Sequence, residues 1–310
     1  MLTHSVWATQ LPLLDHCAID WSRVKRARYF CYQRFYYTYP GPIRTLRQRL
    51  IVVPPDRYGD QALIDQRLTV APHPAIAKQY ADTFGNRVWE LNVTHIEREI
   101  AFEAIVTIER MTLGGELFLS DADVAWFCEP TELTAADARI SAVARELATG
   151  ARDHEECAER ISAWVADTMR YALDVTGVRT TAAQALAVGK GLCQDYAHIM
   201  LAICREAGLP ARYVSGHMLA EGGSHAWVEV LLPTTDGRFR ALAFDPTNRR
   251  RPNMSYAIVA VGRDYRDVAP TSGSFTAPYG GQLSCTKRAG LTLVEFVDGE
   301  VVGSDAITPV

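Results

Sequence analysis

The hydrophobic pattern downstream of residue 191 changes from a helical to a strand period, and this change constrains the fold most strongly. From Leu192 onward the apolar residues recur every three or four positions until Pro210 interrupts them, which predicts a helix over residues 192–207. The pattern after Pro210 has a period of two. It predicts three strands, at residues 211–217, 226–232 and 239–244.

Three polar residues stand at the ends of these predicted elements. Cys193 falls in the first turn of the helix, where the helix dipole favours a thiolate. His225 comes directly before the second strand, and Asp245 comes directly after the third. Because adjacent strands lie roughly 5 Å apart, the two side chains can form a hydrogen bond if those strands are antiparallel. The pattern predicts a nucleophile, its base and the carboxylate that orients the base.

A thiol nucleophile also needs donors for the developing oxyanion. The backbone N–H of Cys193 is expected to supply one of them. Gln194 and Tyr171 are the candidates for the second donor.

Three further residues near the motif have structural interpretations. Asp195, in the first turn of the helix, is expected to complement the helix dipole. His198 lies five residues after the thiol on another side of the helix, so we expect a supporting role rather than the role of base. Trp227 is expected mainly to pack in the core, where its ring can also shield the cleft beside His225.

These motifs resemble those of the bacterial transglutaminase-like family. The resemblance is carried by Gly191-Leu192-Cys193-Gln194-Asp195-Tyr196-Ala197-His198, Gly208-Leu209-Pro210-Ala211-Arg212-Tyr213, Ser224-His225-Ala226-Trp227 and Phe244-Asp245-Pro246-Thr247-Asn248. It implies a papain-like catalytic core in which Cys193, His225 and Asp245 form the triad. It also implies a β-rich N-terminal domain. The family includes protein cross-linkers, peptidases, amide-cleaving enzymes and inactive members, so the resemblance leaves the substrate open.

The fold class expected is α+β, with an antiparallel β-sandwich-like domain ahead of the catalytic core. Strand candidates separated by turn signals occupy residues 29–39, 46–53, 62–70, 88–93 and 100–108. Helices are expected at 135–147 after a Thr134 cap, at 153–169 with Asp153 as cap, and at 181–188. The expected divisions are an N-terminal extension (1–27), the β-rich domain (28–115), a helical linker (116–152), the catalytic core (153–270) and a C-terminal strand and tail (271–310).

Composition argues against several classes of protein. The formal net charge of −4 provides no basic field to hold nucleic acid. No run of about 18 apolar residues occurs, and the N-terminus lacks the order of a signal peptide, so we expect a cytoplasmic protein without a membrane partner. The seven cysteines have neither the density nor the spacing of a disulfide scaffold.

A metal centre is the alternative interpretation of the same residues. Zinc accepts thiolate and imidazole ligands, and the candidates would be Cys193, His198, His217 and His225. However, the sequence has no paired Cys-x-x-Cys or His-x-x-x-His unit, and it has no Asp-rich calcium loop. We therefore expect an enzyme that needs no cofactor.

The expected reaction proceeds through a thioester between Cys193 and the acyl group of a peptide or protein amide. Attack by water would make the protein a peptidase or amidase, whereas attack by an amine acceptor would make it a glutaminyl transferase. We favour hydrolysis, because an amine must compete with about 55 M water and the sequence has no marker of a dry amine site. The remaining alternative is a catalytically silent peptide-binding module.

Overall fold

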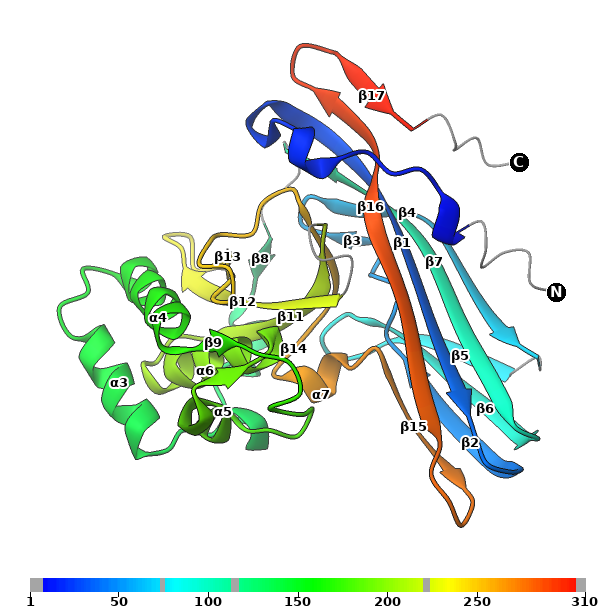
Figure 1. The fold of residues 1–310 in the computed structure, drawn as a ribbon. Coiled ribbons are helices and arrows are strands. Elements are labelled where there is room, and N and C mark those ends of the chain that lie inside the picture. The colour runs from blue at the N-terminus through cyan, green and yellow to red at the C-terminus, as the bar shows by residue number, and fades with distance from the viewer. Residues whose placement is uncertain (1–7, 73–75, 113–116, 220–223, 305–310) are drawn as a thin grey trace.

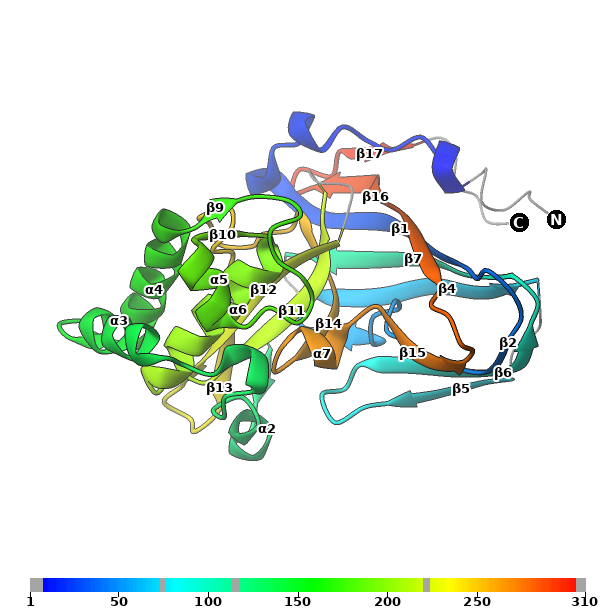
Figure 2. The same ribbon diagram turned by 60° about the horizontal axis from the view of Figure 1, so that its bottom comes forward.

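The computed structural model describes residues 8–72, 76–112, 117–219 and 224–304, and it has the expected α+β architecture. Helices and their sheet lie on one side of the molecule and long strands lie on the other (Figures 1 and 2). The long strands form a six-stranded sheet in the order β17-β16-β1-β7-β4-β3 and a four-stranded sheet in the order β15-β2-β6-β5. Their bounds in chain order are β1 Val24–Thr38, β2 Ile43–Leu50, β3 Arg57–Tyr58, β4 Gln61–Ala71, β5 Ile76–Ala81, β6 Arg87–Ile96, β7 Glu99–Met111, β15 Thr271–Thr276, β16 Gln282–Phe296 and β17 Val301–Gly303.

These two sheets share one hydrophobic core, as the two sheets of a sandwich do. Tyr29 and Phe102 contribute to it from the six-stranded sheet, and Leu46 and Leu91 contribute from the four-stranded sheet. The five strands expected between residues 29 and 108 are therefore present as β1, β2, β4, β6 and β7.

The C-terminal segment completes both sheets of this domain. We expected one strand and a tail over residues 271–310, but the described part of the segment forms three strands. β15 pairs with β2, and β16 pairs with β1 along almost its entire length. β1 is long and rich in aromatic residues, and β16 covers an edge of it that would otherwise be open to other chains. Local sequence patterns could not reveal this pairing, because its partners are more than 200 residues apart.

The catalytic-core side consists of a five-stranded sheet in the order β14-β11-β12-β13-β8, with helices packed against it. The strands are β8 Phe118–Leu119, β11 Ala211–Met218, β12 Ser224–Pro233, β13 Phe239–Phe244 and β14 Tyr256–Gly262. The helices are α2 Asp121–Ala125, α3 Ala138–Ala148, α4 His154–Thr168, α5 Ala182–Val188, α6 Cys193–Glu206 and α7 Tyr265–Val268. The α6 helix is buried on nearly all sides, because it contacts α3, α4 and α5 as well as β11 and β12.

The residues that cap the helices can be compared with the caps predicted from the sequence. Asp153 caps α4 as expected, whereas Thr181, which we expected as the first residue of the next helix, is instead the cap of α5. Each of the two side chains accepts a hydrogen bond from a backbone N–H three residues later. The Thr134 cap is wrong: Asp137 caps α3, whereas Thr134 ends a short 3-10 turn and accepts from the buried Arg205. The α3 helix also packs into the core through Ile140 rather than serving as a linker.

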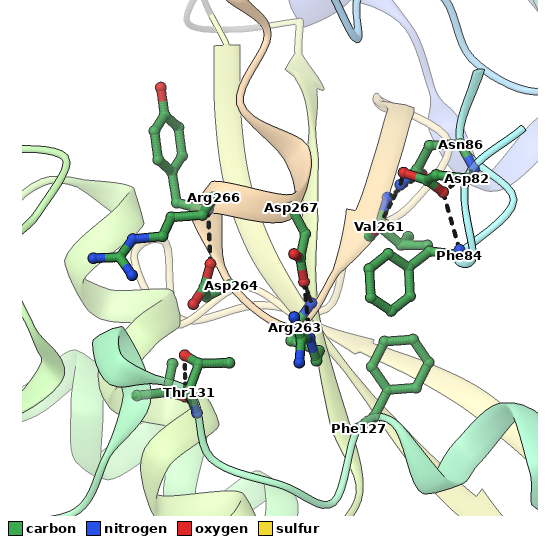
Figure 3. Close-up of polar contacts among 12 residues, drawn as sticks. Asp82, Phe84, Asn86, Phe127, Thr131, Val261, Arg263, Asp264, Arg266 and Asp267 are labelled. Carbon is green, nitrogen blue, oxygen red and sulfur yellow. Dashed lines mark hydrogen bonds and ion pairs between the residues drawn. The ribbon is translucent and has the colours of Figure 1, made fainter. Parts of the chain in front are cut away.

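Side-chain amides join the two halves of the molecule at the edge of β14. Gln61 donates to the carbonyl of Ile258 and accepts from its N–H, both at 2.8 Å. Asn86 does the same with Val261, at 2.7 and 2.8 Å, from the turn between β5 and β6 (Figure 3). These amides satisfy polar groups of an edge strand that would otherwise be buried without partners. The interface therefore sets the position of the β-rich domain beside the catalytic core.

Throughout the described ranges, no helix is both long enough and apolar enough to cross a membrane.

Candidate active site

Cys193 is the first residue of α6 and is only partly buried. Gly189 ends α5 in the left-handed region at φ 68°, and β10 (Lys190–Gly191) pairs with β9 (Arg170–Tyr171) before α6 begins. Gly191 is required here, because an added Cβ would lie 2.4 Å from Oδ2 of Asp195. At this position the backbone N–H of Cys193 has no partner within the helix, and the helix dipole favours negative charge on the sulfur.

Asp195 does more than complement the helix dipole. Its Oδ2 accepts hydrogen bonds from the backbone N–H of Leu192 at 2.7 Å and from Oγ1 of Thr176 at 2.6 Å. The side chain is almost fully buried, and this burial raises the pKa of Asp195. Asp195 therefore fastens the start of α6 to the loop that follows β9.

His225 and Asp245 form a buried hydrogen-bonded pair. Nε2 of His225 lies 2.8 Å from Oδ2 of Asp245, and both side chains are excluded from solvent. Asp245 directly follows β13 and forms an isolated β-bridge with Arg250. β13 lies next to β12, the strand that carries His225. The antiparallel pairing of β12 and β13 places these ends together.

The Asp245 carboxylate is surrounded by donors. Oδ2 also accepts from Tyr256 Oη at 2.6 Å and from Asn248 Nδ2 at 2.8 Å, and Oδ1 accepts from the backbone N–H groups of Thr247 and Asn248. Burial alone would raise the pKa of Asp245, but the hydrogen bonds from His225, Tyr256 and Asn248 outweigh it and lower the pKa below its usual value. The carboxylate is therefore held ionised next to His225.

Aromatic rings fix the orientation of the His225 ring. Trp227 is stacked beside it at a centroid distance of 6.2 Å, and Tyr256 meets it edge-on at 6.0 Å. Trp227 itself is 1% exposed, so its role is packing. Gly216, opposite His225 on β11, leaves space for the indole: an added Cβ would lie 2.6 Å from Cη2 of Trp227 and 2.1 Å from the carbonyl oxygen of Ala257.

His198 is a buried structural residue. Its Nε2 accepts a hydrogen bond from the backbone N–H of Tyr265 at 3.2 Å, and its ring lies 5.4 Å from that of Tyr213. Burial lowers the pKa of His198 to about 3, so the ring is neutral at ordinary pH. It connects α6 with the start of α7.

The two side chains considered for the second oxyanion donor are Gln194, which follows the thiol on α6, and Tyr171 on β9. Gln194 donates to the carbonyl of Gly177 at 3.4 Å, which directs its amide toward the loop after β9. Tyr171, in β9, is paired with Gly191 and is 54% exposed. The same loop carries exposed apolar side chains at Leu173 and Val178, so the surface next to Cys193 is partly hydrophobic.

Electrostatic interactions locate Cys193 relative to the rest of the site. Burial raises the pKa of Tyr213 and of Tyr265, and negative charge on Cys193 contributes to both shifts. Negative charge on Cys193 also acts on Lys287 of β16, whose Nζ donates to Ser224, the residue before His225. The helix that Cys193 begins also packs against β12, the strand that carries His225.

The residues considered for zinc do not share one centre. His198 is engaged with Tyr265, His217 lies 3.2 Å from the side-chain nitrogen of Gln33, and His225 is bound to Asp245. Within the described ranges, a compact group of possible metal ligands occurs instead at residues 15–17, in an exposed turn before β1.

Sequence reasoning missed three contributors: Asn248, Tyr256 and Lys287. Asn248 had a local signal, because an Asp followed three residues later by Asn after a strand is typical of a side-chain-capped turn. Tyr256 and Lys287 had none, since their contacts depend on strands that are distant along the chain.

Comparisons with known proteins agree with this architecture. The family model described as "Transglutaminase-like superfamily" matches residues 141–244, and the model described as "Bacterial transglutaminase-like N-terminal region" matches residues 31–109. An uncharacterised protein of Mycobacterium leprae is 31% identical over 220 residues, which cover 64% of this chain and 76% of that protein. An uncharacterised protein of Mycobacterium tuberculosis is 29% identical over 242 residues, which cover 69% and 76% respectively.

Among solved structures, a "Putative Cysteine Protease" from Cytophaga hutchinsonii is similar at a TM-score of 0.68. The two chains are 19% identical, and the match covers 87% of this chain and 99% of that one. At this level of identity the likeness shows a shared fold.

Proposed function

This chain belongs to the transglutaminase-like superfamily, and on that premise we propose that it is a thiol hydrolase that cleaves peptide or carboxamide bonds through a Cys193 thioester. The observation that carries the proposal is the buried His225–Asp245 hydrogen bond at 2.8 Å, on a strand that packs against the helix that Cys193 begins. The description of the C. hutchinsonii structure as a "Putative Cysteine Protease" is in line with this proposal.

The hydrogen bond to Asp245 assigns distinct roles to the two ring nitrogens of His225. Nε2 is held by the carboxylate, so Nδ1 exchanges the proton with the thiol of Cys193. The carboxylate keeps this tautomer and stabilises the imidazolium that forms. Tyr256 and Asn248 support the pair by fixing the carboxylate.

The reaction then has two halves. The Cys193 thiolate attacks the carbonyl carbon, and the backbone N–H of Cys193 stabilises the oxyanion. His225 gives its proton to the leaving amine, and the C–N bond breaks to leave the thioester. Water, deprotonated by His225, attacks the thioester, and the acid product departs as the C–S bond breaks.

The first test measures whether Cys193 is an activated thiolate. Brief iodoacetamide treatment at mildly acidic pH, followed by mass spectrometry of all seven cysteines, should label Cys193 selectively in the wild type and weakly in His225→Ala. The exposed Cys128 and the buried Cys204 are internal controls for an exposed thiol outside the site and an inaccessible thiol. Labelling of Cys193 at the rate of Cys128 would overturn the assignment.

The second test separates hydrolysis from transfer. Glutaminyl and peptide amides are incubated with and without a primary amine, and both ammonia release and amine incorporation are measured. We expect acid product that depends little on the amine, and no product with Cys193→Ala in a folded protein. Asp245→Asn should retain some activity, because His225 can still act with a poorly set tautomer. Amine incorporation as the main outcome would establish a transferase instead.

A further inference from the structure

Lys287 reaches the catalytic side of the molecule from the six-stranded sheet. On β16 it is the cross-strand partner of Gln33 on β1, so both side chains project from the same face of the sheet. Gln33 lies 3.2 Å from Nε2 of His217, and Lys287 Nζ donates to Ser224 Oγ at 2.7 Å. His217 and Ser224 are themselves partners on β11 and β12. This cross-strand pair thus contacts the end of the hairpin from which His225 projects.

Lys287 also lies within electrostatic reach of the nucleophile. Burial lowers the pKa of Lys287, and negative charge on Cys285 and Cys193 opposes that shift. Tyr265, on α7, experiences the charges of the same two cysteines. The hydrogen bond from Lys287 to Ser224, the residue before His225, therefore holds the ammonium group at the end of β12 that carries the base.

The ammonium group has no acidic partner among the residues that the structure describes. Its contacts there are the Ser224 hydroxyl and the ring of Phe35, 5.7 Å from Nζ. Lys25, on the same sheet, is bound by the carboxylate of Glu295 at 2.6 Å. A partly desolvated ammonium with a neutral hydroxyl as its polar partner lacks the compensation that an anion supplies. The Lys287 side chain is half-buried, so a bound molecule can still reach its ammonium group.

We propose that Lys287 is a substrate-binding residue that selects a carboxylate group close to the bond cleaved at Cys193. The inference rests on the proposed function, since it names a substrate feature for the same site. The carboxylate belongs either to an acidic side chain or to a chain terminus. In both cases it would take its place between the ammonium and the Ser224 hydroxyl, where a charge-assisted hydrogen bond replaces lost hydration.

A pair of alkylating reagents tests this without knowledge of the natural substrate. Iodoacetate and iodoacetamide have similar size and react with the same thiolate, but only iodoacetate carries a carboxylate. The ratio of their rates at Cys193 therefore reports carboxylate recognition, and it cancels changes in thiolate content or in the folded fraction. The imidazolium of His225 also favours the reaction with iodoacetate. The contribution of Lys287 is therefore measured by the change in the rate ratio between wild type and Lys287 variants.

We expect Lys287→Gln to lower the iodoacetate-to-iodoacetamide ratio about tenfold and Lys287→Glu to lower it further, as a charge several ångströms away at a partly solvated site would. Lys287→Arg should keep most of the ratio. The matched control is Lys78→Gln, which removes an exposed lysine on β5 and should leave the ratio at the wild-type value. Added salt should reduce the wild-type ratio.

The two possible failures are distinct. Selective labelling of Cys193 with an equal ratio in wild type and Lys287→Gln would overturn the carboxylate site while preserving the thiol enzyme. Absence of selective labelling by either reagent would overturn the proposed function, and this inference with it.

Two further probes distinguish the sources of the carboxylate. Iodoacetyl-glycine carries a terminal carboxylate, iodoacetyl-aspartic acid amide carries a side-chain carboxylate, and iodoacetyl-glycinamide is the neutral reference. If Lys287 accelerates the reaction of Cys193 with iodoacetyl-glycine, the carboxylate is that of a chain terminus. If Lys287 accelerates the reaction with iodoacetyl-aspartic acid amide, the carboxylate is that of an acidic side chain. If neither reagent is accelerated relative to the reference, the assignment to a substrate carboxylate is wrong.

Discussion

Removal of the Tyr256 hydroxyl tests how the His225–Asp245 pair is held. In Tyr256→Phe the ring remains, so the packing against Trp227 and His225 is kept and no cavity forms. The change removes the hydrogen bond of 2.6 Å to Oδ2 of Asp245. Arg250, which donates to Tyr256 Oη at 2.8 Å, is exposed and can turn to water instead.

The magnitude follows from the kind of hydrogen bond that is lost. A hydrogen bond to a buried charged group contributes about 1.5–3 kcal/mol, so the free energy of unfolding at neutral pH should fall by that amount. The folded-state pKa of Asp245 should rise, because one of the donors that lowers it is gone. With a depressed pKa, Asp245 contributes stability that is present above the ordinary pKa of a carboxyl and is lost as the pH falls through the folded value. The difference between wild type and variant should therefore narrow as the pH falls toward about 4 and below.

Urea unfolding monitored by tryptophan fluorescence between neutral pH and about pH 2.5, which is below the ordinary pKa of a carboxyl, measures both effects. The matched control is Tyr29→Phe, another buried tyrosine, whose hydroxyl donates to the neutral carbonyl of Met254. It should cost about 1 kcal/mol at every pH, because no charge is involved. Selective alkylation of Cys193 should survive in Tyr256→Phe within several-fold, since His225 and Asn248 still hold the carboxylate.

Two results would refute this reasoning. Equal stability of Tyr256→Phe and wild type at neutral pH would mean that the hydroxyl does not stabilise the carboxylate. A loss that does not change with pH, as in Tyr29→Phe, would mean that Asp245 is not the group affected.

Three other changes are informative. In His198→Gln the amide oxygen can still accept from the backbone N–H of Tyr265, and acid should destabilise the fold less than in wild type. The pKa of His198 is about 3 in the folded protein against 6.5 ordinarily, so the wild type loses at most about 5 kcal/mol of stability as the pH falls between those values. Urea unfolding at neutral and acidic pH measures this difference. Gly216→Ala should lose about 1–3 kcal/mol or more and slow Cys193 alkylation, whereas Gly280→Ala, with open space around it, should do neither. Treatment with a calcium chelator should leave the rate of Cys193 alkylation unchanged, and a slower rate would show that a bound metal ion supports the site.

The local structure around the candidate site could be predicted from sequence. The glycines at 189 and 191 end one helix and leave room for the start of the next, so the thiol had to lie at a helix N-terminus. The alternating pattern after Pro210 placed His225 and Asp245 at adjacent strand ends, and the strand pairing then brought them within 2.8 Å. These features depend on residues within a few positions of one another, where backbone preference and hydrophobic period are decisive.

Tertiary structure decided what surrounds that local motif. The donors on Asp245 include Tyr256 from β14, and the cation that donates to Ser224, the residue before His225, is Lys287 from β16, a strand whose pairing partner begins at Val24. The pairing of β16 with β1 and the amide contacts of Gln61 and Asn86 with β14 depend on which edges remain open after the sheets form. No local period encodes this choice, because it is made by the burial of whole faces and the satisfaction of edge hydrogen bonds across more than 200 residues.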